Sequence, residues 1–272
     1  GVELELNYIP VNKKNFTWKI NLNLTHYKNK ITYLPDEKKT TVMDGHGGYM
    51  NGSRYYGEDL PINTWYMKRF AGLSEDGLSL WYYTDKETNE EKTTTTYSTG
   101  DFYLCGDPNP DLYGGFGTSI TFHGFDLSTQ FSYLVGGLTY DYGYAGMMGN
   151  PTATSVGNRW HKDVLKAWSP ENPSSTIPRW HFNDLNTTGS SDRFLIDGSY
   201  LNLQNIQVGY TLPDSWTSHL KIKNLRLYFV CDNVYYWSKR KGLDPRRSIS
   251  GVGTSGKIAP FRTYSGGISL QF

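Results

Sequence analysis

Apolar and polar residues alternate strictly over several segments of this chain, each about ten residues long. In the segment 16–25, every even-numbered residue from Phe16 to Leu24 is apolar, and every odd-numbered residue is polar. Successive side chains of a β-strand point to opposite faces, so this alternation predicts strands with one apolar and one polar face. A strand of about ten residues is also long enough to cross a lipid bilayer at a tilt.

Seven segments follow this pattern: 1–9, 16–29, 112–122, 125–135, 200–213, 225–237 and 263–272. In the fifth segment the apolar parity switches between Leu203 and Ile206, which predicts a β-bulge near Asn205. The sixth segment ends with aromatic residues on both faces, which we interpret as a strand leaving a membrane.

The connections between the predicted strands alternate in length. Short connections span 9–15, 123–124 and 213–223, whereas long connections span 35–110, 138–199 and 238–261. Outer-membrane barrels have short periplasmic turns and long outer loops. The sequence therefore predicts an all-β, transmembrane antiparallel β-barrel with long extracellular loops, lipid on the apolar parity and a wet lumen on the polar one. The last strand then runs down to the periplasm and helps close the barrel, with Phe272 in the inner aromatic girdle.

Composition neither opposes this interpretation nor indicates a charged partner. The net charge is +1, so no polyanion is indicated, and no nucleic-acid partner is expected. No apolar run approaches the roughly 18 residues of a transmembrane helix, and the mean hydropathy of −0.57 is what a sheet with one wet face would average to. The chain has only two cysteines, Cys105 and Cys231, and we expect them to be free thiols rather than a disulfide. No signal peptide is visible, and a chain that starts at Gly1 is expected to be a processed or truncated piece.

Seven strands do not close a single-chain barrel of the usual kind, which has an even number of strands and at least eight. Either the chain is part of a larger barrel, or an eighth strand lies within 35–110 and gives a small stand-alone barrel. In that loop, 65–73 and 78–84 are also candidates for a hairpin standing above the membrane. A rival from another class is a secreted, soluble β-sandwich that binds carbohydrate through aromatic loops.

Particular motifs resemble a known family. Residues 105–137, CGDPNPDLYGGFGTSITFHGFDLSTQFSYLVGG, are similar to a signature of the SusC/RagA family of TonB-dependent outer-membrane transporters. Further segments resemble elements of that family in the same order: 61–73, 168–180, 191–213, 225–237, 241–246 and 262–272. The resemblance implies a barrel of about 22 strands around a plug. It also implies that residues 1–272 are the C-terminal portion of that barrel, without its plug or N-terminal strands.

The same resemblance implies a function and partners. A SusC-like importer of the bacterial outer membrane takes up glycan or peptide oligomers together with a SusD-like surface lipoprotein. TonB acts on the missing N-terminal region, and the family commonly assembles as a dimer of transporter–lipoprotein pairs. No enzymatic activity and no cofactor are expected.

Two sets of residues are candidates for the transport path. Flat aromatic side chains in the long loops suit sugar rings or partner proteins, although packing within the loops is the more common role for each. These loop candidates are Trp65, Tyr66, Trp81, Tyr82, Tyr83, Tyr140, Tyr142, Trp160, Trp168 and Trp180. Asp126, Gln130, Arg226 and Asp232 are the candidates for the lumen wall.

Other motifs are weaker. The segments 44–48, 159–163 and 179–184 each place a histidine near an aspartate, but none has a third ligand at metal-site spacing, so no metal site is expected. The stretch 160–168 is a candidate for a short amphipathic helix in an outer loop. GVGTSGK (251–257) matches a phosphate-binding loop only up to its lysine, because Ile258 stands where Ser or Thr would bind magnesium, so a flexible outer loop is favoured.

Overall fold

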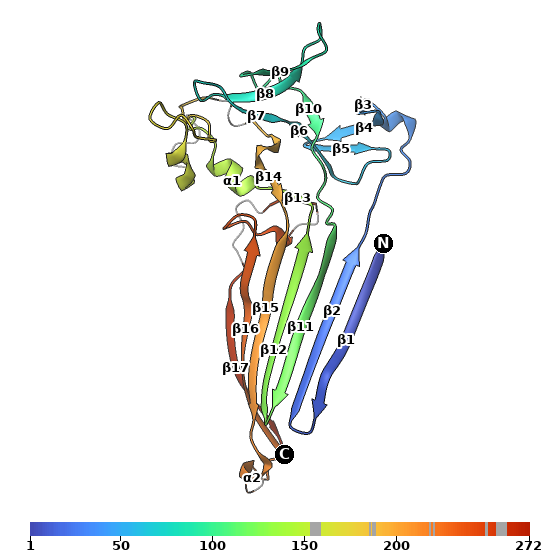
Figure 1. Cartoon of the computed structure of the whole chain (residues 1–272), viewed down its shortest axis with the longest axis vertical. Coiled ribbons are helices and arrows are strands. Elements are labelled where there is room, and N and C mark those ends of the chain that lie inside the picture. The colour runs from blue at the N-terminus through green and yellow to red at the C-terminus, as the bar shows by residue number, and fades with distance from the viewer. Residues whose placement is uncertain are drawn as a thin grey trace.

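The computed structural model describes residues 1–152, 159–184, 186, 189–217, 219, 221–247, 250–253 and 260–272. Its main feature is one antiparallel sheet of seven long strands, in the order β1-β2-β11-β12-β15-β16-β17 (Figure 1). The strands are β1 (Val2–Lys13), β2 (Phe16–His26), β11 (Leu112–Phe122), β12 (Phe125–Val135), β15 (Tyr200–Thr211), β16 (Asn224–Ser238) and β17 (Thr263–Gln271). All seven predicted strands are confirmed, and they lie side by side in chain order.

The predicted bulge in β15 is confirmed. Its pairing with β16 shifts between Leu203 and Asn205, and its pairing with β12 shifts opposite Gln130 and Phe131. Side chains alternate between the two faces of a strand, so the extra residue keeps the apolar side chains before and after the bulge on the same face. A second bulge lies in β1, where the register shifts between Tyr8 and Val11, around Pro10. Proline has no N–H to donate to the ladder. The strand nevertheless continues beyond Pro10 and ends at Lys13, four residues past its predicted end.

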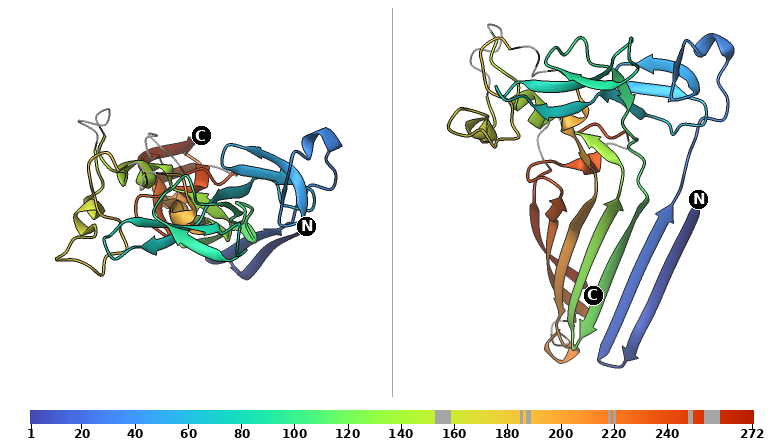
Figure 2. Two further views of the ribbon diagram at one scale, coloured as in Figure 1. Left: turned by 90° about the horizontal axis from the view of Figure 1, so that it is seen from above. Right: turned by 45° about the horizontal axis from the view of Figure 1, so that its top comes forward.

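The apolar side chains form rows across one face of the sheet. Leu6 pairs with Leu22, Leu22 with Phe116, and Phe116 with Phe131 in successive strands. This face is open: Ile268, for example, keeps 65% of its surface exposed. The sheet is a single curved layer, and the other sheets lie beyond one of its ends (Figure 2). The soluble β-sandwich is therefore contradicted for the described part of the chain, because no second sheet covers the apolar face.

One polar group on the apolar face is fully satisfied. The Thr118 hydroxyl accepts a hydrogen bond from the Trp18 indole N–H at 2.8 Å and donates one to the carbonyl of Lys19 at 3.2 Å. An unsatisfied hydroxyl or indole N–H in hydrocarbon would be costly. This pairing makes a threonine compatible with a face that meets lipid.

The long connections fold into a separate body at one end of the strands (Figure 1). We call the described residues of 27–111 and 136–199 the cap. Its strands are β3 (Thr41–Met43), β4 (His46–Asn51), β5 (Arg54–Gly57), β6 (Thr64–Lys68), β7 (Phe70–Leu73), β8 (Ser79–Thr84), β9 (Glu91–Thr94), β10 (Phe102–Leu104), β13 (Leu138–Tyr140) and β14 (Leu195–Asp197). They form a five-stranded sheet, β10-β6-β5-β4-β3, a three-stranded sheet, β7-β8-β9, and the pair β13-β14.

Helices are few and short: α1 (Tyr142–Met147), α2 (Asp214–Thr217), and the 3-10 turns η1 (Asp36–Lys38), η3 (Lys162–Lys166), η5 (Asp192–Phe194) and η7 (Pro245–Arg247). Among the described residues, none of the helices is long and apolar enough to span a membrane. The amphipathic helix expected over 160–168 is reduced to η3, a single 3-10 stretch.

The structure decides two expectations for the loop 35–110. The hairpin above the strands is confirmed, because β7 pairs with β8, although β6 joins the other sheet of the cap. The eighth barrel strand is contradicted for this loop, which is described throughout: its strands pair only within the cap.

The only buried hydrophobic cluster identified among the described residues lies in the cap, not on the long sheet. It contains Trp65, Met67, Tyr140, Met148 and Phe194. Hydrogen bonds join the two long loops around it: the Trp65 indole N–H donates to the carbonyl of Leu138 at 3.1 Å, and the Tyr97 hydroxyl donates to the carbonyl of Ser190 at 2.8 Å. The cap is thus one folded body built from two connections.

Both cysteines are free thiols, as expected. Burial against the cap core raises the pKa of the Cys105 thiol to about 11.

At pH 8 only about one molecule in a thousand would then carry the reactive Cys105 thiolate. We expect iodoacetamide at pH 8 to label Cys105 about a hundredfold more slowly in the native protein than after unfolding, as measured by peptide mass spectrometry. Equal rates in the two states would show that the thiol is not buried.

Candidate functional site

The polar face of the long sheet carries an aligned row of hydrophilic residues. Strand register places these residues directly opposite one another across the whole sheet: Asn7, Asn21, Gly117, Gln130, Asn205, Asp232 and Thr263. We call this row the polar belt. Except for the glycine, every member offers a carboxamide, carboxylate or hydroxyl group, so the belt forms a hydrophilic band across one face of the curved sheet.

Local packing orients the side chains of the belt. Asn205 donates a hydrogen bond from Nδ2 to the Oδ1 atom of Asp232 at 2.7 Å. Gly117 leaves room for its neighbours, since a Cβ at this position would overlap the side-chain oxygens of Gln130 and Asn21. Any larger residue there would push two belt carboxamides out of place.

A bidentate ion pair lies on the same face, nearer the short turns. Arg226 donates from Nε to Asp126 Oδ1 at 2.9 Å and from Nη2 to Oδ2 at 2.6 Å. Both side chains are about three-quarters shielded, and the pair closes over Gly209, where a Cβ would overlap it. The structure thus places Asp126, Gln130, Arg226 and Asp232 on the polar face; that this face is a lumen remains a prediction.

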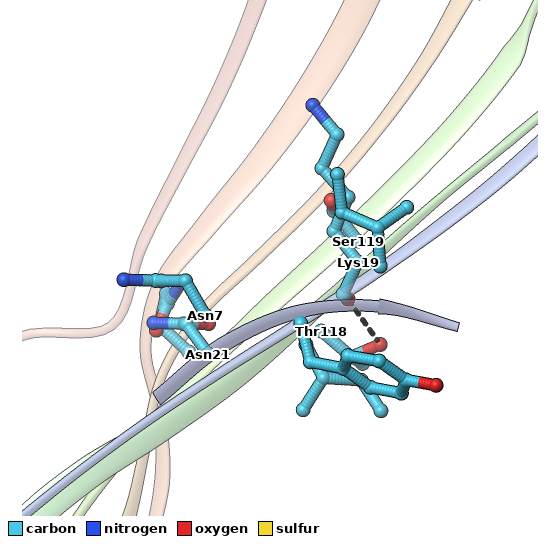
Figure 3. A pocket seen from close by; sticks show the side chains of 9 residues that line it. Asn7, Lys19, Asn21, Thr118 and Ser119 are labelled. Carbon is cyan, nitrogen blue, oxygen red and sulfur yellow. Dashed lines mark hydrogen bonds between the residues drawn. The ribbon is translucent and has the colours of Figure 1, made fainter. Parts of the chain in front are cut away.

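A pocket of about 340 Å³ opens beside the bulge of β1. Asn7 and Asn21 point to the same side of it, and the Lys19 side chain extends from β2, two residues before Asn21 (Figure 3). The sequence did not single out these residues, because the pocket depends on the irregular pairing around Pro10. Amides with one lysine suit hydration or a polar protein segment and form no catalytic group.

A second pocket, of about 370 Å³, lies where the polar face meets the cap. Tyr27, Tyr113 and Tyr200 line it together with Arg246. Arg246 is held in place, because its Nε and Nη2 atoms both donate to Asp244 at 2.8 Å. The sequence did not predict this aromatic pocket either, since its lining residues come from five separate segments of the chain.

The ten aromatic loop candidates fall into three groups. Trp65, Tyr66, Trp81 and Tyr140 are buried, with at most 6% of their surface exposed. The large rings of these four fill the cap interior, and ligand or partner contact by any of the ten stays a prediction. Tyr82, Tyr83, Trp160 and Trp168 are half-buried, whereas Tyr142 and Trp180 are exposed.

Of the exposed and half-buried rings, two groups are the better candidates for ligand or partner contact. Trp160 and Trp180 pack edge to face with centroids 5.6 Å apart. Tyr142 lines a pocket of about 420 Å³ between the cap and the loop after β16, to which His161 and Arg240 also contribute. Arg240 is paired with Asp141, so this pocket does not offer a free guanidinium group.

Two arginines are desolvated inside the cap without a carboxylate partner among the described residues. Arg54 lies 3.1 Å from the centroid of the Trp65 ring and donates to the backbone carbonyls of Asn63 and Ser250. Burial lowers the pKa of Arg54 to about 10, and burial lowers that of Arg193 similarly. Aromatic faces and backbone carbonyls take the place of counter-ions, which fixes these side chains as structural elements.

The histidine–aspartate segments do not form a metal centre in the described part of the chain, where no group of three potential ligands occurs. His46 bonds to the carbonyl of Glu58 at 2.8 Å, and His161 lies 3.2 Å from Asp163. Of the loop 251–257, residues 254–257 lie outside the described residues, so the phosphate-loop interpretation stays untested.

Comparisons with known proteins agree with this geometry. No protein-family model matches the chain. The chain is 28% identical to TonB-dependent receptor P3 of Formosa agariphila, over 100% of this chain and 28% of that protein. It is 26% identical to TonB-dependent receptor SusC of Bacteroides thetaiotaomicron, over 100% of this chain and 26% of that protein. It thus spans little more than a quarter of these relatives.

A solved structure described as the RagAB peptide transporter superposes on the chain with a TM-score of 0.81 at 23% identity, covering 99% of this chain and 29% of the other. The resemblance to SusC/RagA-like TonB-dependent transporters is therefore confirmed, and so is the fold class, part of a transmembrane antiparallel β-barrel. The relatives also support the outer-membrane location.

Proposed function

We propose that residues 1–272 are the C-terminal portion of the barrel of a SusC-like nutrient importer, which takes up glycan or peptide oligomers with a SusD-like surface lipoprotein. The observation that carries the proposal is the two-faced sheet: an open apolar face, a continuous polar belt behind it, and a folded cap at one end only. In this arrangement the strands form the wall, and the cap forms the surface that meets the lipoprotein.

The two edges of the sheet support a larger assembly. β1 and β17 each pair on one side only within the described residues. An unpaired strand edge in lipid leaves backbone groups unsatisfied at several kcal/mol each. We propose that earlier barrel strands pair with both edges, that a plug packs against the polar belt, and that TonB acts through a region outside this chain. The assembly would be a dimer of transporter–lipoprotein pairs.

The polar face suits transport and offers no chemistry. The ion pair of Asp126 and Arg226 is mutually neutralised, and amides and hydroxyls outnumber the other charged groups of this face, Glu3, Glu5, Lys19 and Asp232. Such a wall stays hydrated and lets a polar oligomer pass without binding it tightly.

The test is to purify the intact transporter that contains this chain from outer membranes through an affinity tag. We expect a surface lipoprotein to copurify in a 1:1 ratio, and replacement of residues 36–104 by a short linker to abolish that copurification. The control is heat-modifiable migration on electrophoresis, which reports a folded barrel in both proteins. If the folded wild-type transporter is purified and no lipoprotein comes with it, the proposed partner is contradicted. A separate comparison of the uptake of labelled oligosaccharide with the uptake of labelled peptide would identify the substrate class.

A further inference from the structure

The loop after β16 is strongly basic. Residues 238–262 contain seven Lys and Arg residues and one acidic residue. The structure neutralises two of these cations: Arg240 pairs with Asp141 of the cap, and Arg246 pairs with Asp244. Among the described side chains of this loop, Lys241 and Arg262 have no ion-pair partner.

Two of the remaining cations, Lys241 and Arg262, line one groove of about 560 Å³. The groove follows the part of β16 beyond Asp232, where pairing with β17 has ended. Neither cation forms an ion pair within the described ranges, and none of the residues that line the groove is acidic. Two unpaired cations facing one hollow without a counter-ion favour an anionic ligand.

Exposed aromatic side chains of the apolar side of the sheet line this groove or lie next to it in the chain. Tyr235 and Trp237 keep 50% and 49% of their surface exposed, and their rings pack edge to face. Phe261 and Tyr264 flank Arg262 and are 77% and 61% exposed. Aromatic rings gather where a barrel crosses the membrane–water interface. On the proposed function, the groove is thus at the height of the lipid headgroups of the outer leaflet.

We propose that this groove binds the phosphate groups of an anionic lipid of the outer leaflet, with Lys241 and Arg262 as the charged contacts and the rings of Tyr235 and Trp237 against the acyl chains. The inference rests on the proposed function, because it needs the apolar face to meet lipid. Basic residues placed beside an aromatic belt are a recurring way to recognise anionic headgroups.

A transported substrate is a less suitable occupant. Tyr235 and Trp237, which share the outward parity of β16, border the groove on one side, and Tyr236 and Arg246 line it from the polar side. An oligomer moving along the polar face would meet Tyr236 and Arg246 but not the outward rings of Tyr235 and Trp237. The lipid fits because one molecule supplies both a phosphate and a hydrocarbon chain.

The experiment measures lipid retention by the intact transporter that contains this chain. Native mass spectrometry in detergent compares bis-phosphorylated lipid A with the same lipid stripped of both phosphates. We expect the wild-type protein to prefer the phosphorylated lipid, and the K241Q/R262Q variant to bind it about tenfold more weakly, since each surface cation near a headgroup contributes a factor of several. Raising the salt concentration is expected to weaken binding further.

A matched control removes the same charge elsewhere. Lys13 and Lys14 are exposed at the turn between β1 and β2, at the other end of the strands, so K13Q/K14Q is expected to bind lipid like the wild type. Excess inorganic phosphate is expected not to displace the lipid. Equal retention of both lipids, an unaffected K241Q/R262Q variant, or displacement by phosphate alone would overturn the proposal. Heat-modifiable migration and lipoprotein copurification are scored on the same samples, so failure of the proposed function remains distinguishable.

Discussion

Replacing Phe131 by arginine is expected to destabilise the barrel by about 2–4 kcal/mol, whereas arginine at the adjacent Gln130 is expected to cost about 1 kcal/mol or less. Phe131 lies near the middle of β12 on the apolar face and stacks on Phe116 with centroids 4.7 Å apart. A charge at mid-membrane depth must be dehydrated or drag water into the hydrocarbon. Gln130 belongs to the polar belt, where an added guanidinium group stays hydrated.

The measurement is urea-induced unfolding of the intact transporter refolded into phosphatidylcholine vesicles, followed by tryptophan fluorescence. Phe131→Leu separates the loss of ring stacking from the effect of charge, and we expect it to cost less than Phe131→Arg. The two neighbouring arginine variants decide which face meets lipid. Comparable losses at both positions, or a larger loss at Gln130, would refute the assignment of the faces.

Alternation with a period of two was enough to predict the long sheet, because a membrane strand must separate apolar from polar side chains at every position. The bulge of β15 was predictable for the same reason, since the switch from Leu203 to Ile206 breaks the parity. The bulge around Pro10 was not predictable. The sequence of β1 alone does not show that the strand pairs with β2 again beyond the proline. Sequence pattern therefore identified the strands but not every irregularity in their pairing.

The cap shows the opposite situation. Its strands are mostly three to six residues long, too short for a periodic signal, and its aromatic residues gave no sign of their burial. Trp65 and Trp180 look equivalent in the sequence, yet the first is fully buried and the second is 43% exposed. Which ring is buried depends on contacts between the two long loops, which no local pattern reports.

The polar belt lies between these cases. Asp126, Gln130, Arg226 and Asp232 were chosen by parity, and the structure places all four on one face. The alignment of Gln130 with residues of six other strands was not predictable, since it depends on six successive registers. A one-residue slip in any of them would move the remaining side chains to the other face.

The cap core leads to the second large expected effect: Trp65→Ala should destabilise the cap by about 3–5 kcal/mol. The substitution removes a fully buried indole that packs at a tilt against Tyr140 and donates to the Leu138 carbonyl. It also removes the ring that covers Arg54, and leaves this buried cation beside a cavity with no carboxylate partner in the described residues. An uncompensated buried charge adds to the cost of the cavity.

Hydrogen exchange measured by mass spectrometry separates the cap from the barrel in the intact transporter. We expect Trp65→Ala to raise exchange throughout residues 36–104 and 138–152 while the strands of the long sheet stay protected, since those strands do not share the cap core. Trp180→Ala is the matched control, because an exposed ring of the same size should cost under about 1 kcal/mol. Equal exchange in the two variants would mean that Trp65 is not the centre of the core. Trp65→Ala could open the cap and abolish lipoprotein copurification while the barrel stays folded. That result would mean that binding of the lipoprotein requires a rigid cap. A surface that first has to be ordered binds its partner more weakly, by the free energy of that ordering.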